Sequence, residues 1–103
     1  MPGNMSNLMK QAQRMQRQME EGQKELETKE FVAKTGGGAV EVAVNGKKEV
    51  LRLTLSEEIV DPEDIETLQD AVVAAVNEAM RQADEASTEL MGKMTGGLGG
   101  LPF

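Results

Sequence analysis

The sequence predicts an α+β protein with the element order α-β-β-β-α, built from two long helices and a three-stranded antiparallel sheet. Three observations predict this class. A heptad-spaced pattern opens the chain, a period of two follows, and a second long helical pattern comes next. The 103 residues suffice for one domain, and we assign residues 1–94 to it.

The first helix is expected over about residues 6–28, which are rich in good helix formers and contain no proline. Ser6 or Asn4 can cap its start. Its apolar or small residues are spaced alternately three and four apart, as in a heptad seam: Met5, Leu8, Ala12, Met15, Met19, Gly22 and Leu26. Such a narrow seam suits pairing with one or two other helices.

Three strands are expected next, over about residues 30–35, 39–44 and 49–55. In the last two, apolar residues recur at a period of two, which is typical of half-buried strands. Three glycines, residues 36–38, turn the chain between the first two strands. A phosphate-binding loop is not expected there, because it needs a Lys-Ser/Thr pair and a following helix. The strands should form a meander with one apolar face.

Asn45-Gly46 between the second and third strands is a strong hairpin signal. A four-residue loop would set Val42 opposite Leu51. A tight two-residue loop would leave Val42 facing Glu49, so we favour the longer loop or a bulge.

The second helix is expected over about residues 62–93. Asp61 is a natural N-cap, Pro62 suits the first helical position, and the acids that follow favour the positive end of the helix dipole. Residues 95–103 have no periodicity and are expected to form a flexible glycine-rich tail.

Helix length predicts a homodimer. The second helix would be about 48 Å long and the first about 35 Å, whereas a compact chain of this size is roughly 34 Å across. The helices must therefore project, and their apolar stripes need a second copy to cover them. An antiparallel pairing would bring the methionine-rich ends of the two helices together, either as simple interface filling or as soft tips that flex around a ligand.

Composition argues against enzymatic chemistry. His, Cys, Trp and Tyr are absent, so there is no imidazole or thiol nucleophile, no ordinary zinc or haem site and no disulfide. The acids of residues 56–70 lack the spacing of a calcium loop. No cofactor, metal site or small-molecule substrate is expected. No apolar run is long enough to span a membrane, so a cytoplasmic protein is expected.

The charge is unevenly distributed. The chain carries 11 basic and 18 acidic residues, a net charge of −7, but residues 1–19 contain three bases and no acid. With the seam at positions a and d, Lys10, Arg17 and Lys24 fall at f and Arg14 at c. These four residues, here called the basic stripe, include members spaced about 10.5 Å apart along the helix.

A one-sided basic stripe on a projecting helix has the shape that binds phosphates, so we expect duplex DNA contact at its four residues. Arg81 and Lys93 are weaker candidates. Because Phe31 and Phe103 are the only aromatics, base stacking is not expected, and contact would be to the DNA backbone. The alternative is a solvated outer face, since f positions are polar in any coiled coil.

Several motifs in fixed order carry a family resemblance. They are a Met- and Gln-rich first helix, the triple glycine, Val40-Glu41-Val42-Ala43-Val44-Asn45-Gly46, Asp61-Pro62-Glu63-Asp64, Ala75-Val76-Asn77-Glu78-Ala79 and a glycine-rich end in Leu101-Pro102-Phe103. Over essentially the whole chain this set resembles the YbaB/EbfC family of bacterial nucleoid-associated proteins.

The resemblance implies an α-β-β-β-α protomer and a tweezer-shaped homodimer. It also implies DNA binding in the bacterial nucleoid, with a role in nucleoid organisation or gene expression. A second hypothesis is a protein-interaction module whose helical arms clamp another protein, with DNA association secondary. Its basis is the acidic surface and the methionine-rich helix ends.

Overall fold

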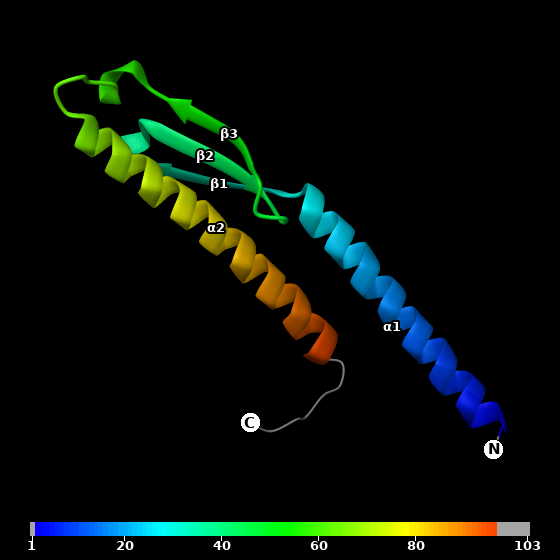
Figure 1. Ribbon diagram of the computed structural model, residues 1–103. Helices are drawn as coiled ribbons and strands as arrows, with labels where there is room; N and C mark the ends of the chain where they lie inside the picture. Colours follow the sequence, from blue (N-terminus) through cyan, green and yellow to red (C-terminus); the bar gives the residue numbers. More distant parts are fainter. Residues whose placement is uncertain (1, 97–103) are drawn as a thin grey trace.

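The structure, a computed structural model, describes residues 2–96 and the side chains of residues 5–93. In chain order, its elements are α1 (Pro2–Thr28), β1 (Glu30–Thr35), β2 (Val40–Asn45), β3 (Val50–Leu55) and α2 (Ile65–Gly96), with short 3-10 turns at Gly36–Gly38 and Glu57–Ile59 (Figure 1). The strands form one antiparallel sheet in the order β1-β2-β3. The predicted fold class and element order are confirmed.

The core lies between α2 and the first two strands. Its centre is formed by Val40, Val42 and Val44 of β2, which are completely buried. The remaining buried members come from β1 and α2: Phe31, Ala33, Ala75, Ala79 and Ala83. Alanines at helical spacing let α2 approach the sheet closely, so the β2 valines are covered without any large aromatic side chain from α2.

The third strand lies outside this core. Leu55 pairs with Val40 and Leu53 with Val42, so these side chains share the face that α2 covers on β1 and β2. The helix packs chiefly on those two strands, however. The apolar residues of β3 are therefore 38–50% exposed, and we call them the β3 strip: Val50, Leu51, Leu53 and Leu55.

The hairpin register differs from the prediction. Val42 lies opposite Leu53 rather than Leu51, a shift of two residues. The irregularity between Ala43 and Val44 places Val44 opposite Val50, which bears out the expectation of a longer loop or a bulge. The shift preserves the face of each side chain because the pleat repeats every two residues.

Helix boundaries also differ from the prediction. The first helix begins at Pro2, a residue that suits a first helical position. Asp61 is not the N-cap of α2: its Oδ1 accepts a hydrogen bond from the Glu63 backbone N–H at 2.9 Å, within a turn that precedes the helix. Asp64 is the acid at the start of the helix, and its carboxylate accepts the Thr67 hydroxyl at 2.7 Å.

The end of α2 lies three residues beyond its expected limit, at Gly96. The segment expected to be a flexible tail therefore starts inside the helix, and its remainder, residues 97–103, lies outside the described residues.

The molecule is elongated, with extents of 75 × 28 × 15 Å and a radius of gyration of 20.4 Å. A compact domain of this length would have a radius of gyration of about 13 Å. The two helices run antiparallel, but α1 extends far past the body (Figure 1). Only its last turns meet α2, around Gly22 and Leu90. Met5 and Met9 stay exposed, so within one chain the methionine-rich end of α1 is not covered.

Candidate nucleic-acid interface

The four residues of the basic stripe lie on α1, and all four are exposed. Three of them, Lys10, Arg14 and Arg17, lie in the first two thirds of α1, and Figure 1 shows this end of the helix projecting from the body. From Met5 to Gln18 every side chain is exposed, so in a single chain this stretch is open to solvent on all sides. A ligand as wide as a duplex can therefore approach the stripe without displacing another element.

The stripe keeps its charge free of intramolecular neutralisation. Within residues 5–93, the ion pairs engage four other bases: Lys47, Lys48, Arg52 and Arg81. No pair among these described side chains engages a residue of the stripe. A base without a directly bound carboxylate keeps its N–H donors available for phosphate.

Arg81 behaves differently. Its guanidinium donates hydrogen bonds to Glu78 at 2.6 and 2.9 Å and to Glu85 at 2.8 Å. The Glu78 carboxylate raises the pKa of Arg81, and the same hydrogen bonding lowers the pKa of Glu78. Arg81 stays charged, but two acids offset its positive field, which weakens it as a DNA contact.

The stripe is not uniform along the helix. Glu21 lies one helical turn from both Arg17 and Lys24, and Glu20 is four residues before Lys24. The lysine at its end is therefore surrounded by acids, whereas residues 5–19 contain none. Lys10 and Arg14 have no acid within one helical turn and therefore carry the strongest positive potential, whereas Arg17 has Glu20 and Glu21 three and four residues after it. The sequence already contains this signal, in the helical spacing of the acids.

The most acidic segment of the chain lies far from the start of α1. The acid-rich segment, residues 57–70, includes the first turns of α2 and lies at the opposite end of the long axis from the start of α1 (Figure 1). Repulsion of a polyanion falls with distance and with ionic screening, over about 8–10 Å at physiological salt. The net charge of −7 is therefore compatible with a local site for phosphate.

The described residues offer no aromatic platform for bases. Phe31 is 7% exposed in the core, with the Lys29 ammonium 5.6 Å from its ring centroid. Nor does the described part of the chain contain a group of three or more acids that could hold a metal ion. The arrangement suits contacts with the sugar-phosphate backbone, which position a protein on DNA without reading sequence.

No helix within residues 2–96 is both long enough and apolar enough to cross a bilayer.

Several known proteins are similar to this chain in sequence or in structure. A nucleoid-associated protein of Agathobacter rectalis is 68% identical over 103 residues, covering all of this chain and 91% of its own. One from Ruminiclostridium cellulolyticum is 55% identical over 100 residues, covering 97% of this chain and 87% of its own. The crystal structure of an uncharacterized protein from Helicobacter pylori matches with a TM-score of 0.75 and 25% identity, over 88% of this chain and 96% of that one.

The family comparison covers nearly the whole sequence, since residues 1–98 match the YbaB/EbfC DNA-binding family. The description of that family names DNA binding. Because this match covers nearly the whole sequence and the relatives above are more than half identical, the chain belongs to the YbaB/EbfC DNA-binding family.

Proposed function

We propose that the protein is a homodimer that grips duplex DNA through backbone contacts of α1, and that it acts in nucleoid organisation or the regulation of gene expression. The observation that carries the proposal is the basic stripe: exposed, free of ion pairs among the described side chains, and placed on a projecting helix. Family membership supports DNA as the partner.

Two uncovered apolar surfaces support the dimer. The β3 strip faces the same side as the core but is left exposed, and Val60, Ile65 and Val73, later in the chain, are also exposed. On α1 the seam residues Met5 and Leu8 are more than 60% exposed. A second copy related by a two-fold axis would cover the strip with its own strip, leaving the basic stripes outward.

The charge balance predicts binding that is strongly sensitive to salt. Two chains carry −7 each, hence −14 in total, so affinity depends on the locally concentrated bases. With Lys10, Arg14 and Arg17 on the α1 helix of each of two chains, about six phosphate contacts form. The logarithm of the association constant should then fall with a slope of about −5 against the logarithm of salt concentration.

A neutralised stripe tests the proposal. The triple variant Lys10→Gln, Arg14→Gln, Arg17→Gln is expected to lose nearly all of the salt-dependent DNA binding in a fluorescence anisotropy titration, while its mass in solution stays that of a dimer. A matched control with the same change in net charge neutralises three bases elsewhere: Lys34→Gln, Arg52→Gln, Arg81→Gln.

The control is expected to bind DNA with nearly the parental salt slope. Equal losses in both triple variants would mean that only overall charge matters, which refutes the assignment to α1. Unchanged binding in the stripe variant, together with a stoichiometric protein partner in pull-down, would favour the protein-clamping hypothesis instead.

A further inference from the structure

Within one chain, the direction of the projecting helix is set by the contacts of its last turns. Between Met5 and Gln18 every side chain of α1 is exposed, and Met19 is its first partly buried residue among those described. One support is at Gly22, where an added Cβ would lie 2.7 Å from Leu90 Cδ1 of α2. Any slack in these few contacts is amplified along the helix, which is about 40 Å long.

The second support is backbone against backbone. The tip of the β2–β3 hairpin abuts the last turn of α1, so close that a Cβ on Gly46 would lie 2.1 Å from the Leu26 carbonyl oxygen. That oxygen belongs to a helix backbone and cannot rotate away as a side chain can. The turn itself does not require glycine at this position, because Gly46 is not in the left-handed region; Lys48 is, at φ 63°. Gly46 is therefore required by the approach of the hairpin to α1.

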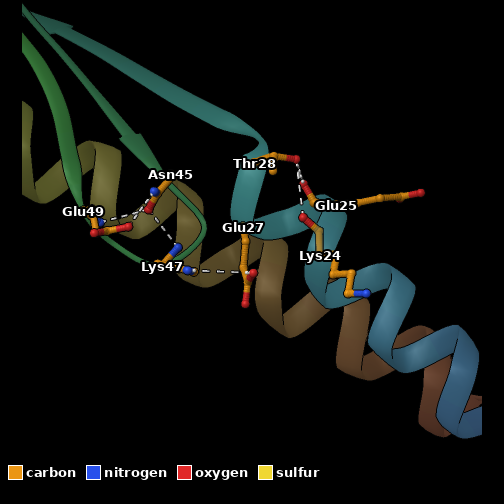
Figure 2. Close-up of polar contacts among 7 residues, drawn as sticks. All are labelled: Lys24, Glu25, Glu27, Thr28, Asn45, Lys47 and Glu49. Atoms are coloured by element: carbon orange, nitrogen blue, oxygen red, sulfur yellow. Dashed lines mark hydrogen bonds and ion pairs between the residues drawn. The ribbon is translucent and has the colours of Figure 1, made fainter.

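The hairpin is held stiff by one side chain. Asn45 Oδ1 accepts hydrogen bonds from the backbone N–H groups of Lys47 at 2.9 Å and Glu49 at 3.0 Å, and Asn45 Nδ2 donates to Glu49 Oε1 at 2.9 Å (Figure 2). Asn45 is 9% exposed. A buried amide with three hydrogen bonds inside the hairpin fixes the loop in one conformation, so the hairpin acts as a rigid unit.

Two lysines link the hairpin tip to both helices. Lys47 Nζ lies 4.0 Å from a carboxylate oxygen of Glu27 on α1 (Figure 2), and the Lys48 ammonium pairs with Asp84 of α2. Lys48 does so from a left-handed backbone conformation that non-glycine residues rarely adopt. Exposed ion pairs contribute little stability singly. Their value here is that they join one rigid turn to two separate helices.

We propose that the hairpin Asn45–Glu49 is a brace that sets the angle between α1 and α2, and that Gly46 is a positioning residue for DNA binding. It acts through α1, without touching DNA. The inference rests on the proposed function, because the helix that it positions carries the basic stripe.

A loosened brace lowers affinity without removing any DNA contact. If α1 samples many directions, only the fraction of molecules whose α1 has a binding-competent direction engages DNA. The apparent dissociation constant then rises by the inverse of that fraction. A competent population of about one tenth therefore costs about tenfold in affinity.

The brace is tested by measuring the angle and the affinity on the same protein. The chain contains no cysteine, so Gln13→Cys on α1 and Thr88→Cys on α2 give two unique spin-label sites. Labelled chain is diluted with unlabelled chain so that the distance is measured within one chain. We expect a narrow distance distribution in the parent. In Gly46→Ala we expect a broad or shifted distribution and a DNA affinity about tenfold weaker.

Gly92→Ala is the matched glycine control, because a Cβ there meets nothing within 4 Å. It should keep both the distribution and the affinity. A second test variant, Lys48→Gly, removes the backbone strain of a lysine in the left-handed conformation and also removes the ion pair with Asp84. It should broaden the distribution while its unfolding midpoint stays at or above the parental value, and it decides the question if Gly46→Ala does not fold.

A parental distance distribution in Gly46→Ala, or in Lys48→Gly if only the latter folds, overturns the brace. A changed distribution with unchanged DNA affinity overturns the positioning role. Failure of the proposed function gives a different result: the neutralised stripe would then bind DNA normally, while the spin-label distances would still respond to the hairpin variants.

Discussion

At the scale of single residues, the bases of this protein fall into paired and unpaired sets. Arg81 has Glu78 three residues before it and Glu85 four residues after it, a spacing that predicts helical ion pairs from sequence alone. The pair between Arg52 and Glu30 was not predictable in this way, because it joins β3 to β1 and depends on strand register. Sequence spacing can therefore indicate bases that pair with acids on the same helix. It does not reveal bases that pair with acids through tertiary contacts.

Removal of one stripe base should weaken DNA binding without changing the fold. Arg17→Gln leaves one phosphate per chain without its cation, so it should lower affinity severalfold and reduce the magnitude of the salt slope by about 1 for each phosphate that is no longer neutralised. The measurement is a salt titration of binding to a fixed duplex. Arg81→Gln is the matched control, and an equal effect in that variant would contradict the distinction between free and paired bases.

The Arg52–Glu30 pair should respond to pH. Hydrogen bonding from Arg52 lowers the pKa of Glu30 below its ordinary value near 4.5. The pair therefore contributes its stabilisation above the unfolded-state pKa and loses it as pH falls through the lower folded-state value. Carboxyl titration by NMR should show the Glu30 pKa rising in Arg52→Gln. No change in that variant would mean that the pair does not persist in solution.

At the scale of elements, the two long helices and the strands were predictable from periodicity, but several boundaries were not. Asp61-Pro62 has the composition of a helix start, yet the helix begins at Ile65 and Asp64 receives the Thr67 hydroxyl. Both acids are acceptable caps by residue type. The choice depends on how the preceding turn closes, and here the Asp64 N–H donates to the Asp61 carbonyl at 2.9 Å.

The difference between the two acids is measurable. Asp64→Ala removes the acceptor at the start of α2 and should lower the free energy of unfolding by about 1 kcal/mol. Asp61→Ala should cost less, because that carboxylate serves a surface turn. Chemical denaturation followed by circular dichroism gives both values. A larger loss in Asp61→Ala would restore Asp61 as the cap.

At the scale of the whole molecule, the elongated shape follows from the length of the helices. The exposure of β3 follows from the fact that, within the described residues, α2 is the one helix that packs chiefly on the sheet. Periodicity predicted one apolar sheet face but not that α2 would leave the β3 strip open. The physical reason is width: α2, with its narrow alanine stripe, packs chiefly on the two strands β1 and β2. The direction of α1 could not be predicted either, because it depends on the approach of Gly46 to Leu26 across a tertiary contact.

The β3 strip is the surface to perturb for assembly. Leu53→Glu places a charge on this exposed apolar surface, so it should shift the mass in solution toward that of the monomer. The core beneath α2 is not altered, so the helical circular dichroism signal should be retained. Light scattering and circular dichroism on the same sample provide the two readouts. Thr54→Glu, on the opposite face of β3, is the matched control and should remain dimeric.

The central claim is that two chains together hold one duplex through their α1 helices. Sedimentation equilibrium of the protein with a short duplex at low salt tests it most directly. We expect a complex whose mass is that of the duplex plus two chains of 11.1 kDa, dissociating as salt is raised. A complex containing a single chain, or one that persists unchanged at high salt, would contradict this claim.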